Sequence, residues 1–511
     1  MKNKINIVED ENASVVGSTP ISNDVIPSRI PNMVKPVKDL IKPHFDVIVV
    51  GAGIGGYIHA IKAAQLGLNV MVVEKGAYGG VCLNIGCIPT KALLKTVKVY
   101  DDVINKTKKF GIDIEAGASI NINWDTAQER KNNVVKKLTN GVKYLLDKNK
   151  VTRVAGVAKA ISSTEIVVDD NKYYTCDNLV IATGSIPRKL NLPGFERARE
   201  KEFLIDSTGA LGLQELPKKI VIIGGGVIGV EFACLFSNLG IETTILQGLP
   251  TILEVLDEDL SKEMTKELRN KYKIQIITGA KITEIKHDEI FFKLEGNVNS
   301  IRPDVILESI GRQTVIQGFE NINLELSPQK FINVNEYCET NIKGVYAIGD
   351  VTSKAMLAHV ASHQGIIAAN HIAKLKGLES AHDLVLNIDR IPSCIYSHPE
   401  IATIGKTEQQ LIEQNIEYKQ FKFPFNAIGK ALADDHTSGF VKLIIEPKYK
   451  TVIGAHIIGN RATEMISEIT TLIECEGTIS EVARAIHPHP TMSEAIGEAA
   501  EALDSGFTLN L

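Results

Sequence analysis

The sequence predicts an α/β protein with two Rossmann-like domains and a third, C-terminal domain of α+β type. The order strand, glycine-rich turn, helix, strand occurs at residues 45–75 and again at 218–247. This is an internal duplication and not a solenoid repeat. The C-terminal domain is predicted because the alternating runs FVKLII and TVIGAHIIG precede a helical stretch that begins at Ala462.

The first β-α-β unit begins with the strand FDVIVV and continues through Gly51-x-Gly53-x-x-Gly56 into a helix. In this pattern the first glycine permits a tight turn, and the second lets the backbone approach a pyrophosphate at the helix N-terminus. The third glycine allows close packing of helix against strand. Glu74 ends the next strand, where an acid accepts hydrogen bonds from a ribose. The unit therefore predicts dinucleotide binding.

The second unit repeats the pattern at Gly224, Gly226 and Gly229, but Gln247 stands where the acid is expected. A glutamine can still bond a ribose hydroxyl. The segment QGLPTILE contains no Arg or Lys to balance a 2′-phosphate, which favours NAD over NADP. Two dinucleotide sites in one chain indicate electron transfer between two cofactors, for which FAD and NAD are the natural pair.

Between and beyond these units, helical spacing predicts a helix over residues 123–148, and short strands follow through CDNLVIATGSIP. The runs DVILESIGR and GVYAIGD each predict a strand that ends at a turn. We expect residues 44–189 and 313–384 to form the first domain, 190–312 the second, and 385–511 the C-terminal interface domain. Residues 1–43 are rich in proline and charge, and we expect a disordered tail or linker there.

The bulk composition excludes several classes of protein. The chain has 511 residues and a formal net charge of −5, without a long basic run, which argues against a nucleic-acid partner. No apolar run is long enough to predict a membrane span. Its 7 cysteines are sparse and odd in number, as in a reducing compartment, and the start of the chain resembles neither a signal nor a transit peptide. We therefore expect a cytoplasmic protein.

Cys82 and Cys87 lie close together in the segment GGVCLNIGCIPTK. Along a regular helix they would be about 7.5 Å apart in rise, which exceeds the usual Cα separation of a disulfide, about 6.8 Å. A bridge would need a distorted turn or helix entrance, which Gly86 and Pro89 could provide. A redox-active dithiol is the favoured interpretation. Inert thiols and a metal site remain alternatives, although a second pair of ligands at suitable spacing for zinc is missing.

Seven motifs, in order, resemble the pyridine nucleotide–disulfide oxidoreductases: GAGIGG, GGVCLNIGCIPTKALL, IATGSIP, GGGVIGVE, GVYAIGD, YSHPEIATIG and HPTMSEA. The resemblance spans about residues 44–505. CLNIGCIPTKALL and GAHIIGNRATEMISE are more narrowly similar to the dihydrolipoamide dehydrogenase branch. That branch implies FAD- and NAD-binding domains and a dimerisation domain. It also implies oxidation of protein-bound dihydrolipoamide to lipoamide, with reduction of NAD⁺ to NADH, within 2-oxo acid dehydrogenase complexes.

The resemblance assigns roles to six residues. Cys87 would be the sulfur beside the flavin and Cys82 the sulfur that exchanges with the substrate. Lys91 would lie by the flavin and pair with Glu231, although two solvated surface charges are an alternative reading. His489 would be the base that Glu494 orients. Thr491-x-x-Glu494 is also a capping-box pattern, so Glu494 could instead satisfy the first turn of a helix.

The resemblance also implies the groups that line the cofactors. We expect Asp350 to bind the flavin ribityl chain rather than serve as a plain turn aspartate, and Ala358 and His359 to lie near the flavin ring. Gly311 would flank the nicotinamide nucleotide. The remaining cofactor-binding candidates are the fingerprint glycines, Glu74, Gln247, Lys75, Gly80, Lys91, Gly156, Thr183, Gly184 and Ser185. We expect His487, His398 and His436 to be ordinary histidines.

In the family the C-terminal base serves the cysteine pair of the partner subunit, so the resemblance implies a homodimer. It also implies a small dithiol substrate and, as partners, lipoyl domains and an acyltransferase core. Gln247 and GRQTV depart from the family pattern, in which an acid and Gly-Arg-x-Pro-Asn are common. The alternatives are another FAD-dependent disulfide reductase of glutathione or mercuric type, and a non-catalytic nucleotide-binding scaffold subunit.

Overall fold

The computed structural model describes residues 42–115, 118–352, 355–378, 381–382 and 384–511. The expected linker, residues 1–43, lies outside this range except for its last two residues. Sheets and their covering helices form three lobes, which are defined below. No helix in the described ranges is long and apolar enough to cross a membrane.

The first lobe is built on a sheet in which β1 lies between β2 and β6. Its parallel part has the order β3-β2-β1-β6-β17, because β17 pairs with the C-terminal end of β6. The hairpin β4–β5 adds antiparallel strands beyond the other end of β6. The strands are β1 (His44–Val50), β2 (Val70–Glu74), β3 (Thr152–Ala155), β4 (Ala158–Ser162), β5 (Glu165–Val168), β6 (Lys172–Ile181) and β17 (Val345–Ala347).

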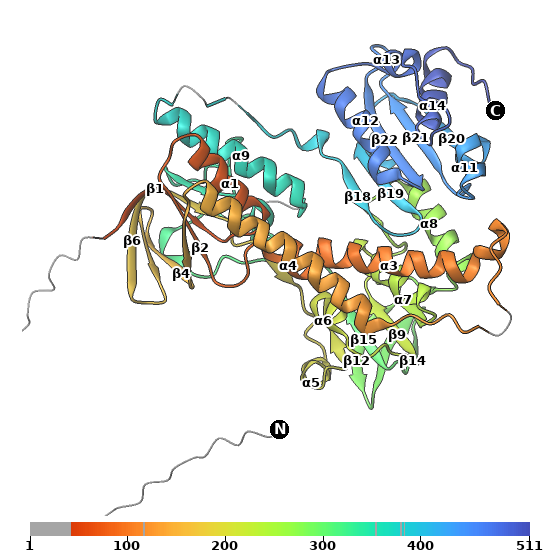
Figure 1. Cartoon of the computed structure of the whole chain (residues 1–511), viewed down its shortest axis with the longest axis horizontal. Coiled ribbons are helices and arrows are strands. Elements are labelled where there is room, and N and C mark those ends of the chain that lie inside the picture. The colour runs from red at the N-terminus through yellow and green to blue at the C-terminus, as the bar shows by residue number, and fades with distance from the viewer. Residues whose placement is uncertain (1–41, 116–117, 353–354, 379–380, 383) are drawn as a thin grey trace, which may run out of the picture. The chain divides into compact units, whose positions relative to one another are not determined.

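Helices α1 (Ile54–Gln65) and α9 (Ala358–Leu375) lie side by side on this sheet (Figure 1). Gly365 makes the close approach possible, because a Cβ atom there would lie 2.7 Å from the carbonyl oxygen of Gly55. The long helix α4 (Trp124–Lys148) matches the expected helix 123–148. Buried Val, Ile and Ala side chains fill the space between sheet and helices. This packing holds the glycine turn that follows β1 at the carboxyl end of the parallel strands.

The second lobe has a parallel sheet of order β11-β10-β9-β15-β8, on which α7 (Val227–Asn238) packs, and α8 (Glu258–Asn270) connects β10 to β11. Its strands are β8 (Leu204–Ile205), β9 (Lys219–Ile223), β10 (Glu242–Leu246), β11 (Gln275–Ile277) and β15 (Val305–Glu308). A separate antiparallel sheet contains β12 (Lys281–Lys286), β13 (Glu289–Leu294) and β14 (Asn297–Ile301). A short antiparallel ribbon of β7 (Ser185–Pro187) and β16 (Arg312–Thr314) joins the first and second lobes.

The C-terminal lobe is an antiparallel sheet of order β18-β19-β22-β21-β20 with helices packed on it (Figure 1). Its strands are β18 (Ser393–Ile395), β19 (Glu400–Gly405), β20 (Lys419–Pro424), β21 (Phe440–Ile445) and β22 (Val452–Gly459). Its helices are α10 (Glu408–Glu413), α11 (Gly429–Ala433), α12 (Ala462–Glu474), α13 (Ile479–Arg484) and α14 (Glu494–Asp504). The predicted fold class, two Rossmann-like units followed by an α+β domain, is confirmed.

The remaining helices are short, except for the one that carries the second cysteine of the pair. They are α2 (Gly80–Ile85), α3 (Cys87–Asn105), α5 (Phe195–Glu200), α6 (Ser207–Gly212), and the 3-10 turns η1 (Thr107–Phe110), η2 (Glu320–Ile322), η3 (Gly349–Val351), η4 (Ile388–Arg390) and η5 (Phe425–Ala427).

Candidate active site

Cys82 and Cys87 lie on two helices that meet at Gly86. Cys82 belongs to α2, Gly86 interrupts the helix with φ −144° and ψ −117°, and Cys87 is the first residue of α3. This is the distorted helix entrance that the spacing of the pair requires. Both side chains are partly buried free thiols, and a hydrogen bond joins them. Among the described residues, no group of three or more His, Cys, Asp or Glu side chains is placed to hold a metal ion.

The two thiols differ in acidity. The hydrogen bond with Cys82 and the ammonium of Lys91 lower the pKa of Cys87, against the opposing effect of burial. The same hydrogen bond, together with burial, raises the pKa of Cys82. Cys87 also stands at the N-terminus of a 19-residue helix, where the aligned peptide dipoles favour a negative charge. The helix N-terminus and Lys91 therefore both favour a negative charge on Cys87.

Lys91 lies one turn after Cys87 on α3 and reaches across to the second lobe. Its Nζ donates to both carboxylate oxygens of Glu231 on α7, at 2.9 and 2.8 Å. The Glu231 side chain is only 5% exposed, so this is not a pair of solvated surface charges. The pairing expected from the sequence is present, and it places a held cation one turn from the Cys87 thiol.

Tyr396 is a third partner of this pair, and sequence reasoning missed it. Its backbone N–H donates to Oε1 of Glu231 at 2.9 Å, and its ring lies 4.8 Å from the Lys91 ammonium. Tyr396 follows β18 of the C-terminal lobe, so all three lobes meet at Glu231. The only signal in the sequence was its place in the family motif YSHPEIATIG.

His489 and Glu494 form a close pair in the C-terminal lobe. Nδ1 of His489 lies 2.7 Å from Oε1 of Glu494, and the other oxygen of Glu494 accepts from the backbone N–H of Thr491 at 2.8 Å. Thr491 is not the N-cap of α14, which begins at Glu494 after Ser493, so the capping-box reading is wrong, although the Glu494 carboxylate does satisfy the backbone donor of Thr491 as well as contacting the imidazole. Burial opposes ionisation of Glu494, but the bonds from His489 and Thr491 outweigh it and lower its pKa.

The His489 side chain is 78% exposed, and within the described ranges no hydrogen bond or ion pair joins it to Cys82 or Cys87 of the same chain. The neighbouring His487 is engaged differently. Its Nε2 lies 2.9 Å from a carboxylate oxygen of Glu468, and this bond raises the pKa of the imidazole. His487 is thus held inside its own lobe, whereas His489 is exposed and its Nε2 has no hydrogen-bond partner among the described residues.

The first fingerprint has the geometry of a pyrophosphate cradle. A Cβ atom at Gly51 would lie 2.3 Å from the oxygen of Ala182, and one at Gly56 would lie 1.9 Å from the oxygen of Gly51. At Gly53 the nearest atom would be 3.9 Å away, so the space in front of that backbone is open. Gly80 is needed beside it, since its own Cβ would strike the Cα of Gly53 at 2.6 Å.

The Glu74 carboxylate is oriented by two backbone N–H groups, one in the glycine turn and one just after β2. Its oxygens accept from the backbone N–H groups of Ala52 at 2.6 Å and Gly76 at 2.8 Å. Both oxygens keep lone pairs for a ligand, because a carboxylate can accept about four hydrogen bonds. An open glycine backbone beside an oriented, charged acceptor fits the adenosine and pyrophosphate of FAD.

The second fingerprint repeats this geometry. The Cβ positions of Gly224 and Gly229 are blocked by the oxygens of Ser309 and Gly224, whereas Gly226 has no atom within 4 Å. Gln247 occupies the ribose position and is only 8% exposed. Its Oε1 accepts from the N–H of Gly225 at 3.0 Å, and its Nε2 donates to the oxygen of Thr251 at 3.1 Å.

The other predicted cofactor residues lie on loops that follow strands of the first lobe. Asp350 is not a plain turn aspartate, because it accepts from the hydroxyl of Ser185 at 2.5 Å, and that hydroxyl accepts from Arg312 at 2.7 Å. Sequence reasoning missed Arg312, although it directly follows Gly311. Burial lowers the pKa of Arg312, against the favourable charges of Asp350 and Cys87.

The remaining candidates lie on turns, on one helix end or at the surface. Thr183 donates its hydroxyl to the oxygen of Val315, and Gly184 and Gly311 adopt positive φ values of +70° and +100°. Gly156 donates its N–H to the oxygen of Glu74 at 3.0 Å, and Lys75 is exposed. Ala358 begins α9, and Nε2 of the exposed His359 lies 2.8 Å from the oxygen of Pro392.

Fold and site together define a nucleotide-binding oxidoreductase that carries a close pair of cysteines. The chain belongs to the pyridine nucleotide-disulphide oxidoreductase family: residues 45–365 match the family itself, and residues 391–500 match its dimerisation domain. Enzymes of this family use FAD and NAD. The family resemblance seen in the sequence is thus confirmed.

Named relatives cover nearly the whole chain. Dihydrolipoyl dehydrogenase of Mycoplasma genitalium is 41% identical over 88% of this chain and 97% of its own length. Dihydrolipoyl dehydrogenase of Bacillus subtilis is also 41% identical, over 90% of this chain and 98% of its own. Among solved structures, the HOCl-induced flavoprotein disulfide reductase RclA of Escherichia coli is similar with a TM-score of 0.76 at 25% identity. That likeness covers 89% of this chain and 99% of that one.

Proposed function

We propose that this chain is a dihydrolipoyl dehydrogenase, which oxidises protein-bound dihydrolipoamide to lipoamide and reduces NAD⁺ to NADH. One observation carries the proposal: two hydrogen-bonded thiols flank the helix break at Gly86, and a Lys91–Glu231 ion pair faces the second thiol. A scaffold subunit has no use for this combination. Relatives that are 41% identical over most of the chain are named dihydrolipoyl dehydrogenase, which supports the same activity.

The chemistry begins with the disulfide form of Cys82 and Cys87. His489 takes a proton from one thiol of the substrate, and the resulting thiolate attacks Cys82. The Cys82–Cys87 bond breaks, and Cys87 leaves as the thiolate that Lys91 stabilises. The second substrate thiol then displaces Cys82 from the mixed disulfide and closes the lipoamide ring. Cys82 recovers the first proton from His489, and His489 takes up the proton of the second substrate thiol, so the protein ends with one thiol, one thiolate and a protonated His489.

FAD, when bound, supplies the route by which the electron pair of the dithiol reaches NAD⁺ as hydride. Residues 44–189 and 313–384 would hold FAD through Gly51, Gly53, Glu74 and Asp350. Residues 190–312 would hold NAD through Gly224, Gly226 and Gln247. The open backbone at Gly53 and Gly226 supports both assignments.

The active enzyme in this proposal is a homodimer, in which His489 of each chain serves the cysteine pair of its partner. Three observations support this arrangement: the match of residues 391–500 to a dimerisation domain, the exposure of His489, and the absence of a hydrogen bond or ion pair from His489 to Cys82 or Cys87 among the described residues. We further propose that the dimer serves a 2-oxo acid dehydrogenase complex in the cytoplasm, where lipoyl domains bring the substrate.

The test is turnover of dihydrolipoamide with NAD⁺ by the purified flavoprotein. Wild type should produce NADH in preference to NADPH, and Cys82→Ser should lose turnover by about 10³-fold or more. Cys475→Ser is the matched control, since Cys475 is an exposed cysteine outside the site, and it should keep full activity. Undiminished turnover by Cys82→Ser would assign the chemistry elsewhere.

The dimer is tested by complementation. His489→Gln and Cys82→Ser should each be inactive as homodimers. If the variants are unfolded gently, mixed in equal amounts and refolded, a mixed dimer contains one intact site, and roughly a quarter of wild-type activity should return. Failure to regain activity, with mixed dimers shown by mass spectrometry, would place the base and the cysteine pair on the same chain.

A further inference from the structure

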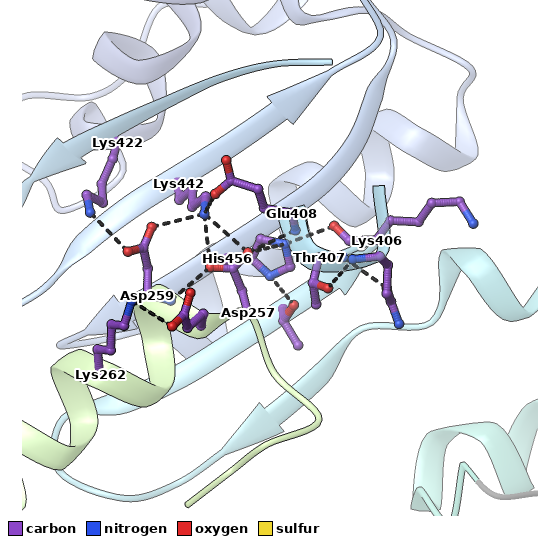
Figure 2. A network of polar contacts seen from close by, with 12 residues as sticks. Asp257, Asp259, Lys262, Lys406, Thr407, Glu408, Lys422, Lys442 and His456 are labelled. Carbon is purple, nitrogen blue, oxygen red and sulfur yellow. Dashed lines mark hydrogen bonds and ion pairs between the residues drawn. The ribbon is translucent and has the colours of Figure 1, made fainter. Parts of the chain in front are cut away.

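Lys442 is the centre of a buried polar network between the second and C-terminal lobes, shown in Figure 2. Its side chain on β21 is only 1% exposed. Its Nζ contacts Asp257 at 3.0 and 3.2 Å, Asp259 at 3.0 Å and Glu408 at 2.7 Å. An ammonium removed from water needs such partners, because an unpaired buried charge is costly. Asp257 is itself 0% exposed, so each charge depends on the other.

Further contacts surround this centre. Asp257 accepts from the backbone N–H of Glu408 at 3.1 Å, and the hydroxyl of Tyr418 donates to Glu408 at 2.7 Å. His456 lies beside Asp257 and bonds Thr403 and the oxygen of Lys406 through its two ring nitrogens. Burial lowers the pKa of His456. The network is thus held from both lobes by charged and neutral groups (Figure 2).

Asp257 connects this network to the second fingerprint. It is the N-cap of α8 and ends the segment that follows Gln247. Within that segment Leu253 donates its N–H to the oxygen of Gly225 at 2.9 Å, and Ser261 of α8 donates to the oxygen of Leu253 at 3.0 Å. Ile252 packs so closely that a Cβ at Gly225 would lie 2.6 Å from it. Residues 247–257 therefore join the glycine turn to Asp257 through direct contacts.

We infer that Lys442 is a positioning residue for the adenosine half of the nicotinamide dinucleotide. Through Asp257 it fixes residues 247–257. This fixes Gln247 and the neighbouring glycine turn in the geometry that receives the ribose and pyrophosphate. The inference rests on the proposed function, which makes the second fingerprint the NAD site. Its consequence is that a residue of the C-terminal lobe controls the affinity of a site in the second lobe.

The experiment measures binding of ADP-ribose to the flavoprotein by calorimetry, because this probe contains the adenosine half and undergoes no redox step. Lys442→Met and Asp257→Asn should each weaken binding by roughly 2- to 30-fold, the range seen when residues outside a site are coupled to it. Asn can still cap α8, so the second variant remains informative if the first fails to fold. The alkylation rate of Cys87 against pH should be unchanged in both variants.

Two controls separate positioning from loss of stability. Lys450→Met breaks the Lys450–Asp504 pair inside the C-terminal lobe, and Lys262→Gln breaks an exposed pair with Glu258 on α8. Both should bind ADP-ribose as wild type does. Wild-type affinity in Lys442→Met and Asp257→Asn, with lowered melting temperatures, would overturn the inference and leave the network merely structural. If wild type itself does not bind ADP-ribose, the proposed NAD site fails instead.

Discussion

The two dinucleotide fingerprints share one backbone and differ in the side chain at the ribose position. Gly51 and Gly224 both have φ +104°, and in both turns the third glycine packs against the oxygen of the first. Glu74 offers a charged carboxylate with two backbone donors, whereas Gln247 offers a neutral amide that is already bonded at both ends. The glycines therefore define the shape of the cradle, and the residue at the end of the second strand defines its charge.

The largest expected effect tests the shared backbone. Gly51→Ala and Gly224→Ala should each cost about 4 kcal/mol, because each adds a Cβ within 2.5 Å of a carbonyl and strains a positive φ. Gly226→Ala is the matched control, with nothing within 4 Å, and should change stability by less than about 0.5 kcal/mol. Denaturant unfolding measures all three. A much smaller loss at Gly224 than at Gly51 would contradict the equivalence of the two turns, and a loss at Gly226 as large as that at Gly224 would show that the crowded Cβ position is not its cause.

A second difference lies on the helices behind the turns. His59 of α1 is fully buried, with Nδ1 bonded to the oxygen of Gly365 and Nε2 unpartnered, while α7 buries the apolar Phe232. Burial lowers the pKa of His59 from 6.5 to about 4. The folded state therefore resists protonation, while the unfolded chain accepts a proton below pH 6.5.

Stability should accordingly be independent of this group above pH 6.5 and should fall as the pH drops from 6.5 to 4, by up to about 3 kcal/mol. His59→Gln keeps a donor for Gly365 without a titrating group, so its stability should decline less over this interval. Urea unfolding at several pH values measures the slopes. Equal slopes for wild type and variant would mean that His59 does not limit acid stability.

Exchange of the ribose-position residue should have a smaller effect. Glu74→Gln should weaken FAD binding by about 2 kcal/mol, or about 30-fold, because hydrogen bonds to a carboxylate are stronger than those to an amide. Titration of the apoprotein with FAD, followed by flavin fluorescence, gives the affinity. Lys75→Gln, which changes the exposed residue next to Glu74, is the control and should change the FAD affinity less.

The reverse exchange, Gln247→Glu, should have the smallest effect. The new carboxylate would repel a 2′-phosphate, so the ratio of kcat/KM for NADP⁺ to that for NAD⁺ should fall about fivefold, or about 1 kcal/mol. The hydrogen bond that Gln247 donates to the oxygen of Thr251 would be lost, because a carboxylate cannot donate. This loss limits any gain in kcat/KM for NAD⁺. An unchanged ratio would show that residue 247 does not read the ribose.

Local pattern explains which parts of the fold and the site were predictable. The strand–glycine–helix units and the helix at 124–148 follow from hydrophobic periodicity, and the kink at Gly86 follows from the spacing of Cys82 and Cys87. The antiparallel sheet β12–β14 was not predicted, because its strands are short and β14 is almost wholly exposed. Periodicity also did not predict the full length of α3.

Sequence alone determined the two cradles, the closeness of Cys82 and Cys87, and the pairing of His489 with Glu494, because each depends on residues that lie near one another along the chain. Only the tertiary structure decided that Tyr396 joins Glu231, that Arg312 holds Ser185, and that Lys442 neutralises Asp257. These partners lie more than a hundred residues apart and leave no periodic trace in the chain. Burial explains these contacts, because a polar or charged group that is removed from water needs a hydrogen-bond or ion-pair partner.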